Sequence, residues 1–148
     1  MHYDIRVTPK VYADAGFKYD STLGFNDNVG FRFGTCYPWK FYDLKAEEKL
    51  PMLEIPLIMQ DGALLLPQKG LRLDKKTALE YITVVANAVE KVGGVLTLLW
   101  HPHFIIKQEW WDLYLKTLKY LSGENPWFVS VKEIGEWWEN SSREYAND

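Results

Sequence analysis

The sequence predicts an α/β fold in a single domain over residues 1–139, with a polar tail over residues 140–148. Two apolar runs, Met52–Met59 and Val95–His101, have the length and residue types of buried strands. Between them, residues 75–92 repeat apolar side chains with the period of a helix, which two glycines end. This strand–helix–strand order is typical of a parallel βαβ unit.

The N-terminal elements are predicted to be short. Residues 3–7 form a strand, and a helix begins at Thr8-Pro9, because threonine caps helices and proline fits the first helical position. Gly16 ends that helix, and a second short strand occupies residues 17–19. The glycine-rich, aromatic segment that follows is expected to be irregular.

The remaining elements complete the pattern. Residues 44–50 are charged and expected at the surface, and Pro56 indicates an edge or a bulge in the 52–59 strand. A helix is expected from about Gln108 to Leu121, then a strand at Trp127–Ser130. Finally, Ser130 and Glu133 match a capping box and open a helix that ends near Glu139.

Composition excludes several classes of function. The net charge of −3 leaves no basic footprint for nucleic acid, and no apolar run is long enough to span a membrane. No signal peptide is visible, and the single Cys36 fits a reducing compartment, so we expect a cytoplasmic protein. Aromatic residues reach 16%, which suits a bulky core and equally suits sugar rings or an interface.

Polar side chains follow three predicted strands. These residues are Asp20, Asp61, and the His101–His103 pair. In a parallel arrangement such strand ends meet at one edge, where sites are usually built, so we expect Asp20 and Asp61 to contact a substrate there. His101 suits general acid or base chemistry, and either aspartate could orient its ring.

Arg32 lies between Phe31 and Phe33, which indicates a partly enclosed guanidinium. Such a group needs a carboxylate partner or a bound anion. A structural ion pair and a role in the site are both open.

The sequence His101-Pro102-His103 also allows a metal site, since alternate residues of an extended segment point to the same side. A catalytic zinc site needs about three protein ligands, and Asp20, Asp61 or His2 could supply the third. This would make the chain a small metallohydrolase. In the competing interpretation, His101 bonds a backbone carbonyl and His103 is merely exposed.

Four segments carry a resemblance to a known family. They are residues 15–24 (Ala-Gly-Phe-Lys-Tyr-Asp-Ser-Thr-Leu-Gly), residues 30–35 (Gly-Phe-Arg-Phe-Gly-Thr), residues 53–57 (Leu-Glu-Ile-Pro-Leu) and residues 98–101 (Leu-Leu-Trp-His). In this order they resemble the C-terminal half of polysaccharide deacetylases, the NodB-homology carbohydrate esterases. That family folds as a distorted barrel of parallel strands and outer helices, so the resemblance implies a partial barrel here.

The resemblance also implies an activity. Members remove acetyl groups from N-acetylated sugars with a divalent metal, commonly zinc. His101 corresponds to the proton donor, Arg32 to the arginine that orients the catalytic aspartate, and Asp61 to a residue that lines the pocket. The family's metal-ligand and base motifs, Thr-Phe-Asp-Asp and His-x-x-x-His, do not occur in this chain. We therefore expect the isolated chain to be inactive and to hold no cofactor. The resemblance implies zinc or another divalent metal for the complete domain.

Two kinds of partner follow from a half barrel, whose open strand edges must be covered. One is a separately encoded N-terminal half, and the other is a second copy of the chain in a homodimer. The alternative function is a non-catalytic module that at most binds carbohydrate. Its stacking faces would come from tryptophans, namely Trp39, Trp100, Trp110 and Trp111.

Overall fold

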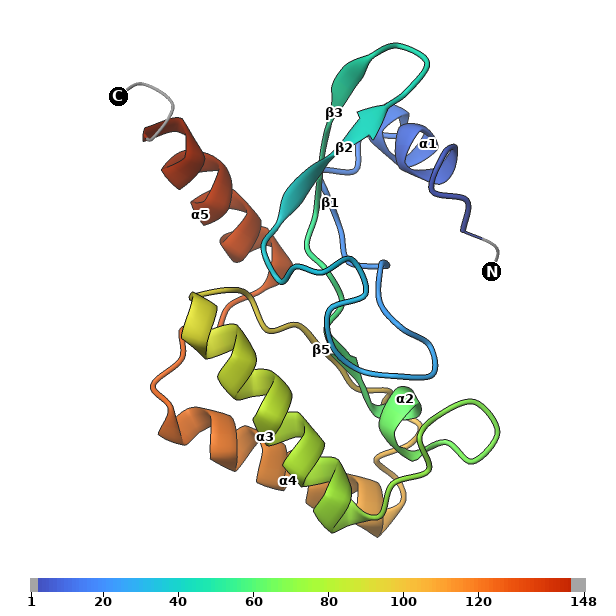
Figure 1. The fold of residues 1–148 in the computed structure, drawn as a ribbon, viewed down its shortest axis with the longest axis vertical. Coiled ribbons are helices and arrows are strands. Elements are labelled where there is room, and N and C mark those ends of the chain that lie inside the picture. The colour runs from blue at the N-terminus through green and yellow to red at the C-terminus, as the bar shows by residue number, and fades with distance from the viewer. Residues whose placement is uncertain (1–2, 145–148) are drawn as a thin grey trace. The chain divides into compact units, whose positions relative to one another are not determined.

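The computed structural model describes residues 3–144, which fold as two compact units of mixed α/β structure (Figure 1). Of the described residues, the first unit contains 3–22, 37–55 and 129–144, and the second contains 23–36 and 56–128. The predicted α/β class is confirmed. No helix within the described range combines the length and apolar character needed to cross a lipid bilayer.

The first unit is built on a three-stranded sheet in the order β1-β3-β2. Strand β1 (Tyr19–Asp20) runs parallel to β3 (Glu48–Glu54), and β2 (Trp39–Asp43) pairs with β3 as an antiparallel hairpin. Helix α1 (Thr8–Asp14) contacts β3, and helix α5 (Val131–Glu144) contacts β1. At Gly135 of α5 an added Cβ would lie 2.2 Å from the ring of Tyr19, so only glycine permits this approach.

Several predictions for the first unit are corrected. Residues 3–7 form no strand, because the amides of Val7 and Thr8 both bond the carbonyl of Asp4 and turn the chain into α1. The hairpin strand β2 lies in a segment predicted to be irregular. The capping box is confirmed, since the Ser130 amide donates to Glu133 and the Glu133 amide donates to the Ser130 hydroxyl. Helix α5 then continues past Glu139 into the predicted tail.

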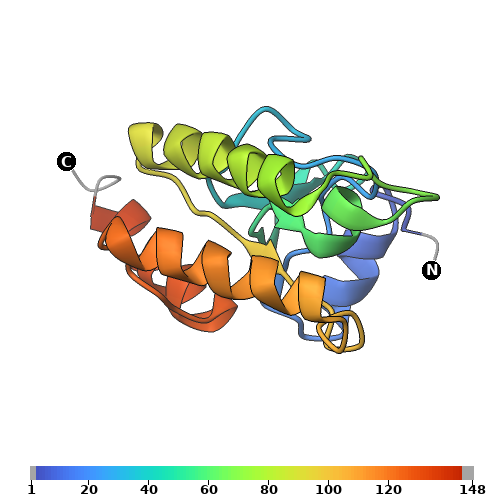
Figure 2. The same cartoon turned by 90° about the horizontal axis from the view of Figure 1, so that it is seen from below.

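The second unit is a parallel strand–helix–strand arrangement with added helices. Strands β4 (Met59–Gln60) and β5 (Leu98–Leu99) pair in parallel and are joined through α2 (Asp61–Leu65) and α3 (Lys75–Val92). Helix α4 (Gln108–Gly123) lies beside α3 (Figure 2). The buried core between these elements consists of Met59, Leu64, Ala78, Ile82 and Leu113.

The boundaries of α3 agree with the sequence because strong local signals mark both ends. Asp74 accepts hydrogen bonds from the amides of Lys76 and Thr77, which caps the first turn. Gly93 ends the helix in the left-handed region, with φ of 66°. Because β4 and β5, on either side of α3 in the sequence, pair in parallel, the predicted parallel βαβ unit is confirmed.

The two long predicted strands are much shorter in the structure. Pro56 interrupts the 52–59 run, so its start belongs to β3 and its end to β4. Thr97 supplies hydrogen bonds at this interruption. Its hydroxyl accepts a hydrogen bond from the Ile58 amide at 2.7 Å and donates one to the Pro56 carbonyl at 2.5 Å. A side chain therefore replaces part of the backbone ladder. The predicted strand at Trp127–Ser130 is wrong, since these residues are irregular.

Candidate functional site: a carboxylate–histidine pair at two parallel strand ends

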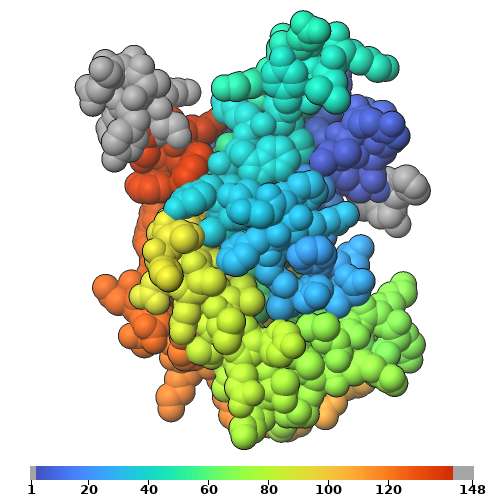
Figure 3. Space-filling model, in the orientation of Figure 1, coloured from blue at the N-terminus to red at the C-terminus, as the bar shows by residue number. Residues whose placement is uncertain are grey.

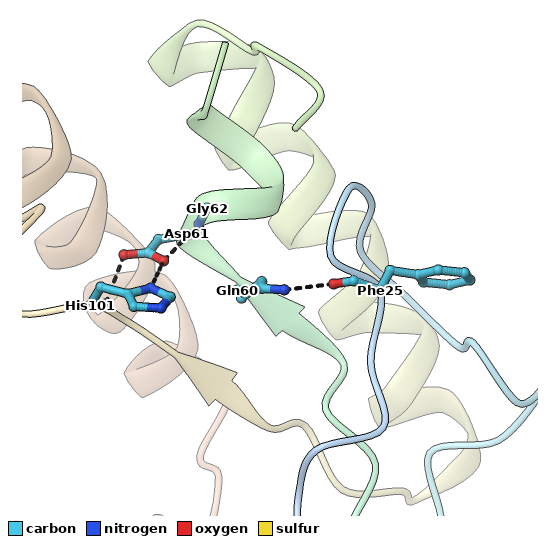
Figure 4. Close-up of polar contacts among 5 residues, drawn as sticks. All are labelled: Phe25, Gln60, Asp61, Gly62 and His101. Atoms are coloured by element: carbon cyan, nitrogen blue, oxygen red, sulfur yellow. Dashed lines mark hydrogen bonds and ion pairs between the residues drawn. The ribbon is translucent and has the colours of Figure 1, made fainter. Parts of the chain in front are cut away.

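The candidate site lies where β4 and β5 end. Asp61 directly follows β4, and His101 follows β5 by two residues. Because the strands are parallel, both side chains emerge at the same edge of the sheet (Figure 4). The expected meeting of polar strand ends is confirmed for this pair.

Asp61 is completely buried and accepts three hydrogen bonds. Its Oδ1 lies 2.6 Å from His101 Nδ1 and accepts from the Gly62 amide at 2.6 Å, while Oδ2 accepts from the His101 amide at 2.8 Å. A buried carboxylate is costly unless donors compensate it, and here two backbone amides and one ring nitrogen do so. The carboxylate therefore grips both the backbone and the ring of His101.

The hydrogen bond to Asp61 determines which ring nitrogen of His101 carries the proton. A carboxylate only accepts hydrogen bonds, so it selects the form of His101 that carries a proton on Nδ1. The other ring nitrogen, Nε2, is then an acceptor in the neutral ring and a donor in the imidazolium. The side chain of His101 is 35% exposed, so this nitrogen can exchange a proton with a bound molecule.

Aromatic contacts also hold His101. The ring of Phe104 lies 5.4 Å from that of His101 and 4.0 Å from that of His103, and it packs at 4.4 Å on the buried Trp110. The Phe104 amide also donates to the His101 carbonyl, which closes a turn. His101 is thus positioned both by charge and by packing.

The residues do not form a metal centre by themselves. Among residues 3–144, no group of three or more His, Cys, Asp or Glu side chains could hold a metal ion. His101 uses Nδ1 for Asp61, and His2, the other ligand considered, lies outside the described residues. The interpretation in which His101 bonds a backbone carbonyl is wrong, because its ring pairs with a carboxylate.

Arg32 belongs to the second unit and has a backbone partner. Its Nη1 donates to the Gly24 carbonyl at 2.6 Å, and its guanidinium carbon lies 5.6 Å from the centroid of the Phe33 ring. The residue as a whole is exposed. The predicted orientation of a catalytic aspartate by Arg32 stays a prediction.

Asp20 belongs to the first unit and has different partners. Its carboxylate accepts from the Tyr3 hydroxyl at 3.0 Å and from the Thr22 hydroxyl at 2.6 Å. Burial, followed by the nearby Asp20 charge, raises the pKa of Tyr3 above its ordinary value of 10.0. The structure therefore gives Asp20 a local role, and its contact with a substrate stays a prediction.

The candidate tryptophans differ in their availability to a ligand. Trp110 is 4% exposed, so the expectation that it offers a stacking face is wrong. Trp100 packs against the core of the second unit and lies 5.4 Å from the Tyr114 ring. Trp39 is half-buried beside Phe41, with ring centroids 4.8 Å apart. Both Trp39 and Trp100 are used in packing, and their predicted binding of substrate stays untested.

Sequence reasoning missed two residues that build the site. Thr97 bridges the strands, as described above, and its only signal is a hydroxyl within an apolar run. Gln60 donates from Nε2 to the Phe25 carbonyl at 2.7 Å. Figure 4 shows Gln60 and Asp61 pointing in opposite directions from the end of β4, so adjacent residues anchor two different segments.

Comparisons with known proteins add no relative. No family model, no curated protein and no solved structure matches this chain. A functional assignment therefore depends on the geometry of the site and on the motifs in the sequence.

Proposed function

We propose that this chain is the C-terminal part of a polysaccharide deacetylase-like protein and supplies the proton donor of the reaction. The observation that carries the proposal is the buried Asp61 bound to His101 at the carboxyl ends of two parallel strands. The order of the four resembling segments supports the same assignment.

In this proposal His101 serves the departing amine. Removal of an acetyl group from a sugar amide breaks a C–N bond, and the nitrogen must gain a proton to leave. The imidazolium of His101 gives the proton from Nε2, while Nδ1 stays bonded to Asp61. The ring becomes neutral, and a proton from solvent restores it for the next cycle.

Asp61 acts as a positioning residue in this scheme. It has no exposed surface, so it reaches a substrate only through His101. Its negative charge offsets the imidazolium, and its bond to the His101 amide keeps the ring at the strand end.

The proposal leaves activation of water to groups outside the described residues. Among residues 3–144, no group of three or more His, Cys, Asp or Glu side chains could hold a metal ion, so no step of the mechanism passes through a metal here. A proton donor without an activated water gives little rate, and the isolated chain is therefore inactive. The missing groups belong to the N-terminal half of the domain, and together the two halves form the distorted barrel.

The short strands favour such a partner. Strand β5 pairs with β4 along one edge only, among the strands that the structure describes, and Leu99 on it is 40% exposed. Parallel sheets are normally buried on both faces. A homodimer is the alternative cover for this edge, and molecular mass in solution distinguishes the two.

Co-expression tests the proposal. The chain is produced with the polypeptide encoded immediately upstream, and the purified pair is assayed for metal-dependent acetate release from chitooligosaccharides. We expect a complex whose kcat falls about 10²–10⁴-fold in H101Q. The matched variant H103Q removes the exposed neighbour and should leave kcat within about twofold.

Two results would overturn the proposal. One is a pair that forms no complex and releases no acetate. The other is an active pair in which H101Q and H103Q behave alike, since His101 would then have no special part in proton transfer.

A further inference from the structure

A hollow in the second unit is not used by the chemistry of His101. It has a volume of about 650 Å³, and it is lined on one side by residues 25–27 with Arg32 and on the other by residues 68–70. Small-molecule sites typically measure roughly 300–1,000 Å³, so the hollow has a suitable size. Figure 3 shows the two segments adjoining at the surface, the first in blue and the second in green.

The first wall is held firmly although it has no regular structure. At Gly24 an added Cβ would lie 2.6 Å from the Leu57 carbonyl oxygen, so the chain lies directly against the segment before β4. The side chain of Gln60 binds the Phe25 carbonyl one residue further on (Figure 4). This wall belongs to the irregular stretch 21–38, and a stretch of that length is usually functional when it is fixed rather than disordered.

The second wall is fixed by the helix that Asp61 begins. At Gly70 an added Cβ would lie 2.5 Å from the Gly62 carbonyl oxygen, and the Leu71 amide donates to the Ala63 carbonyl at 2.8 Å. Lys69 is therefore carried on a loop fastened to α2. Both walls are therefore anchored to the β4–α2 segment.

The hollow is more positive than the chain as a whole. Its lining has two cations, Arg32 and Lys69, against one carboxylate, Asp27, whereas the whole chain has a net charge of −3. Arg32 is held in place by the Gly24 carbonyl and lies near the Phe33 ring, which leaves most of its five N–H donors for a ligand. A guanidinium fixed in this way matches a carboxylate in a bidentate manner.

We propose that this hollow binds the carboxylate of an acidic sugar. Arg32 takes the carboxylate from one wall, and Lys69 approaches it from the other. The side-chain amides of Asn26 and Gln68 both donate and accept hydrogen bonds, which suits ring hydroxyls. The anion preference follows from the lining charges, and the choice of a sugar rests on the proposed function.

A titration of the intact chain followed by ¹H–¹⁵N NMR tests this inference. Glucuronic acid should shift the Arg32 Nε–H signal and the amides of residues 68–70, with an affinity that falls as salt is added. Glucose has the same ring without the carboxylate and should shift neither set. R32Q and K69Q should each weaken binding about tenfold. K76Q is the matched control, since Lys76 lies on α3 outside the lining, and it should bind as the wild type does.

The outcomes separate cleanly. No shift with glucuronic acid, or equal affinity in R32Q and the wild type, overturns the site. Equal binding of inorganic phosphate and glucuronic acid overturns the sugar preference. Because the readout is binding to this chain alone, these failures are distinct from a failure of the His101 proposal, which is measured by catalysis with a second polypeptide.

Discussion

Two aspartates lie at the ends of parallel-paired strands, Asp20 as the last residue of β1 and Asp61 directly after β4, and their surroundings differ sharply. Asp61 in the second unit is fully buried and accepts hydrogen bonds from two backbone amides and a histidine ring. Asp20 in the first unit is half-buried and accepts two hydroxyl groups. Both carboxylates are satisfied, but only the first is bound by rigid backbone donors.

The type of donor decides how firmly each carboxylate holds its neighbours. Hydroxyl donors rotate, and a half-exposed carboxylate can replace them with water at little cost. A buried carboxylate held by backbone amides has no such freedom, so it fixes the ring that it binds. The second unit therefore contains a histidine whose ring is fixed by a buried carboxylate, whereas Asp20 holds Tyr3 and Thr22.

The largest expected effect is the loss of the Asp61 carboxylate. D61A leaves the buried amides of Gly62 and His101 without an acceptor, and we expect the free energy of unfolding to fall by about 2–4 kcal/mol. Urea denaturation followed by tryptophan fluorescence measures this change. The matched variant D20A should lose less than about 1 kcal/mol, because water reaches the groups it releases. Equal losses in the two variants would remove the distinction drawn between the two carboxylates.

The next effect concerns the link between the strands that carry the pair. T97V keeps the shape of the side chain and removes the hydroxyl that joins Ile58 to Pro56. We expect a loss of about 1–3 kcal/mol in unfolding free energy. T97S retains the hydroxyl and is the control, with a smaller loss. If T97V and T97S are equally stable, the bridge does not hold β4 to β5.

The smallest effect belongs to the first unit and depends on pH. Y3F removes one hydroxyl from Asp20 and should lower the unfolding free energy by about 0.5 kcal/mol at neutral pH, less than D20A, which removes both contacts. Burial and the Asp20 charge raise the folded-state pKa of Tyr3, so the folded protein retains this proton longer than the unfolded chain. Wild-type stability should therefore decrease as pH rises above the ordinary value of 10.0, where the unfolded chain ionises.

The same decrease should be weaker in Y3F, since phenylalanine does not ionise. Denaturation curves collected at about pH 8 and about pH 11 provide the comparison. An identical pH dependence in both proteins would contradict the assignment of this effect to Tyr3.

The parts of the fold that could be predicted from sequence are those with strong local signals. Helix α3 has a capping aspartate, a regular apolar face and a terminal glycine, and its boundaries agree at both ends. The parallel pairing of β4 and β5 follows from the strand–helix–strand order and the short connection from α3 to β5. The approach of Asp61 to His101 followed in turn, as one of two candidate aspartates.

The remainder depends on contacts that are distant in sequence. Thr97 forms hydrogen bonds with Pro56 and Ile58, which lie before helix α3 in the sequence. No residue near Thr97 indicates this role. The apolar run at 95–101 has strong strand propensity, yet only Leu98–Leu99 finds a partner strand in the described structure. Burial of Trp110 likewise depends on Phe104, which the tryptophan pattern alone does not reveal.

The central claim is that Asp61 selects the proton position on His101, and NMR of the histidine ring nitrogens tests it most directly. Long-range ¹H–¹⁵N spectra of the full chain, collected where the rings are neutral, distinguish the two tautomers. We predict that His101 carries its proton on Nδ1, that His103 shows the usual mixture, and that D61N returns His101 to that mixture. A proton on Nε2 of His101, or the same tautomer in the wild type and D61N, would contradict the account.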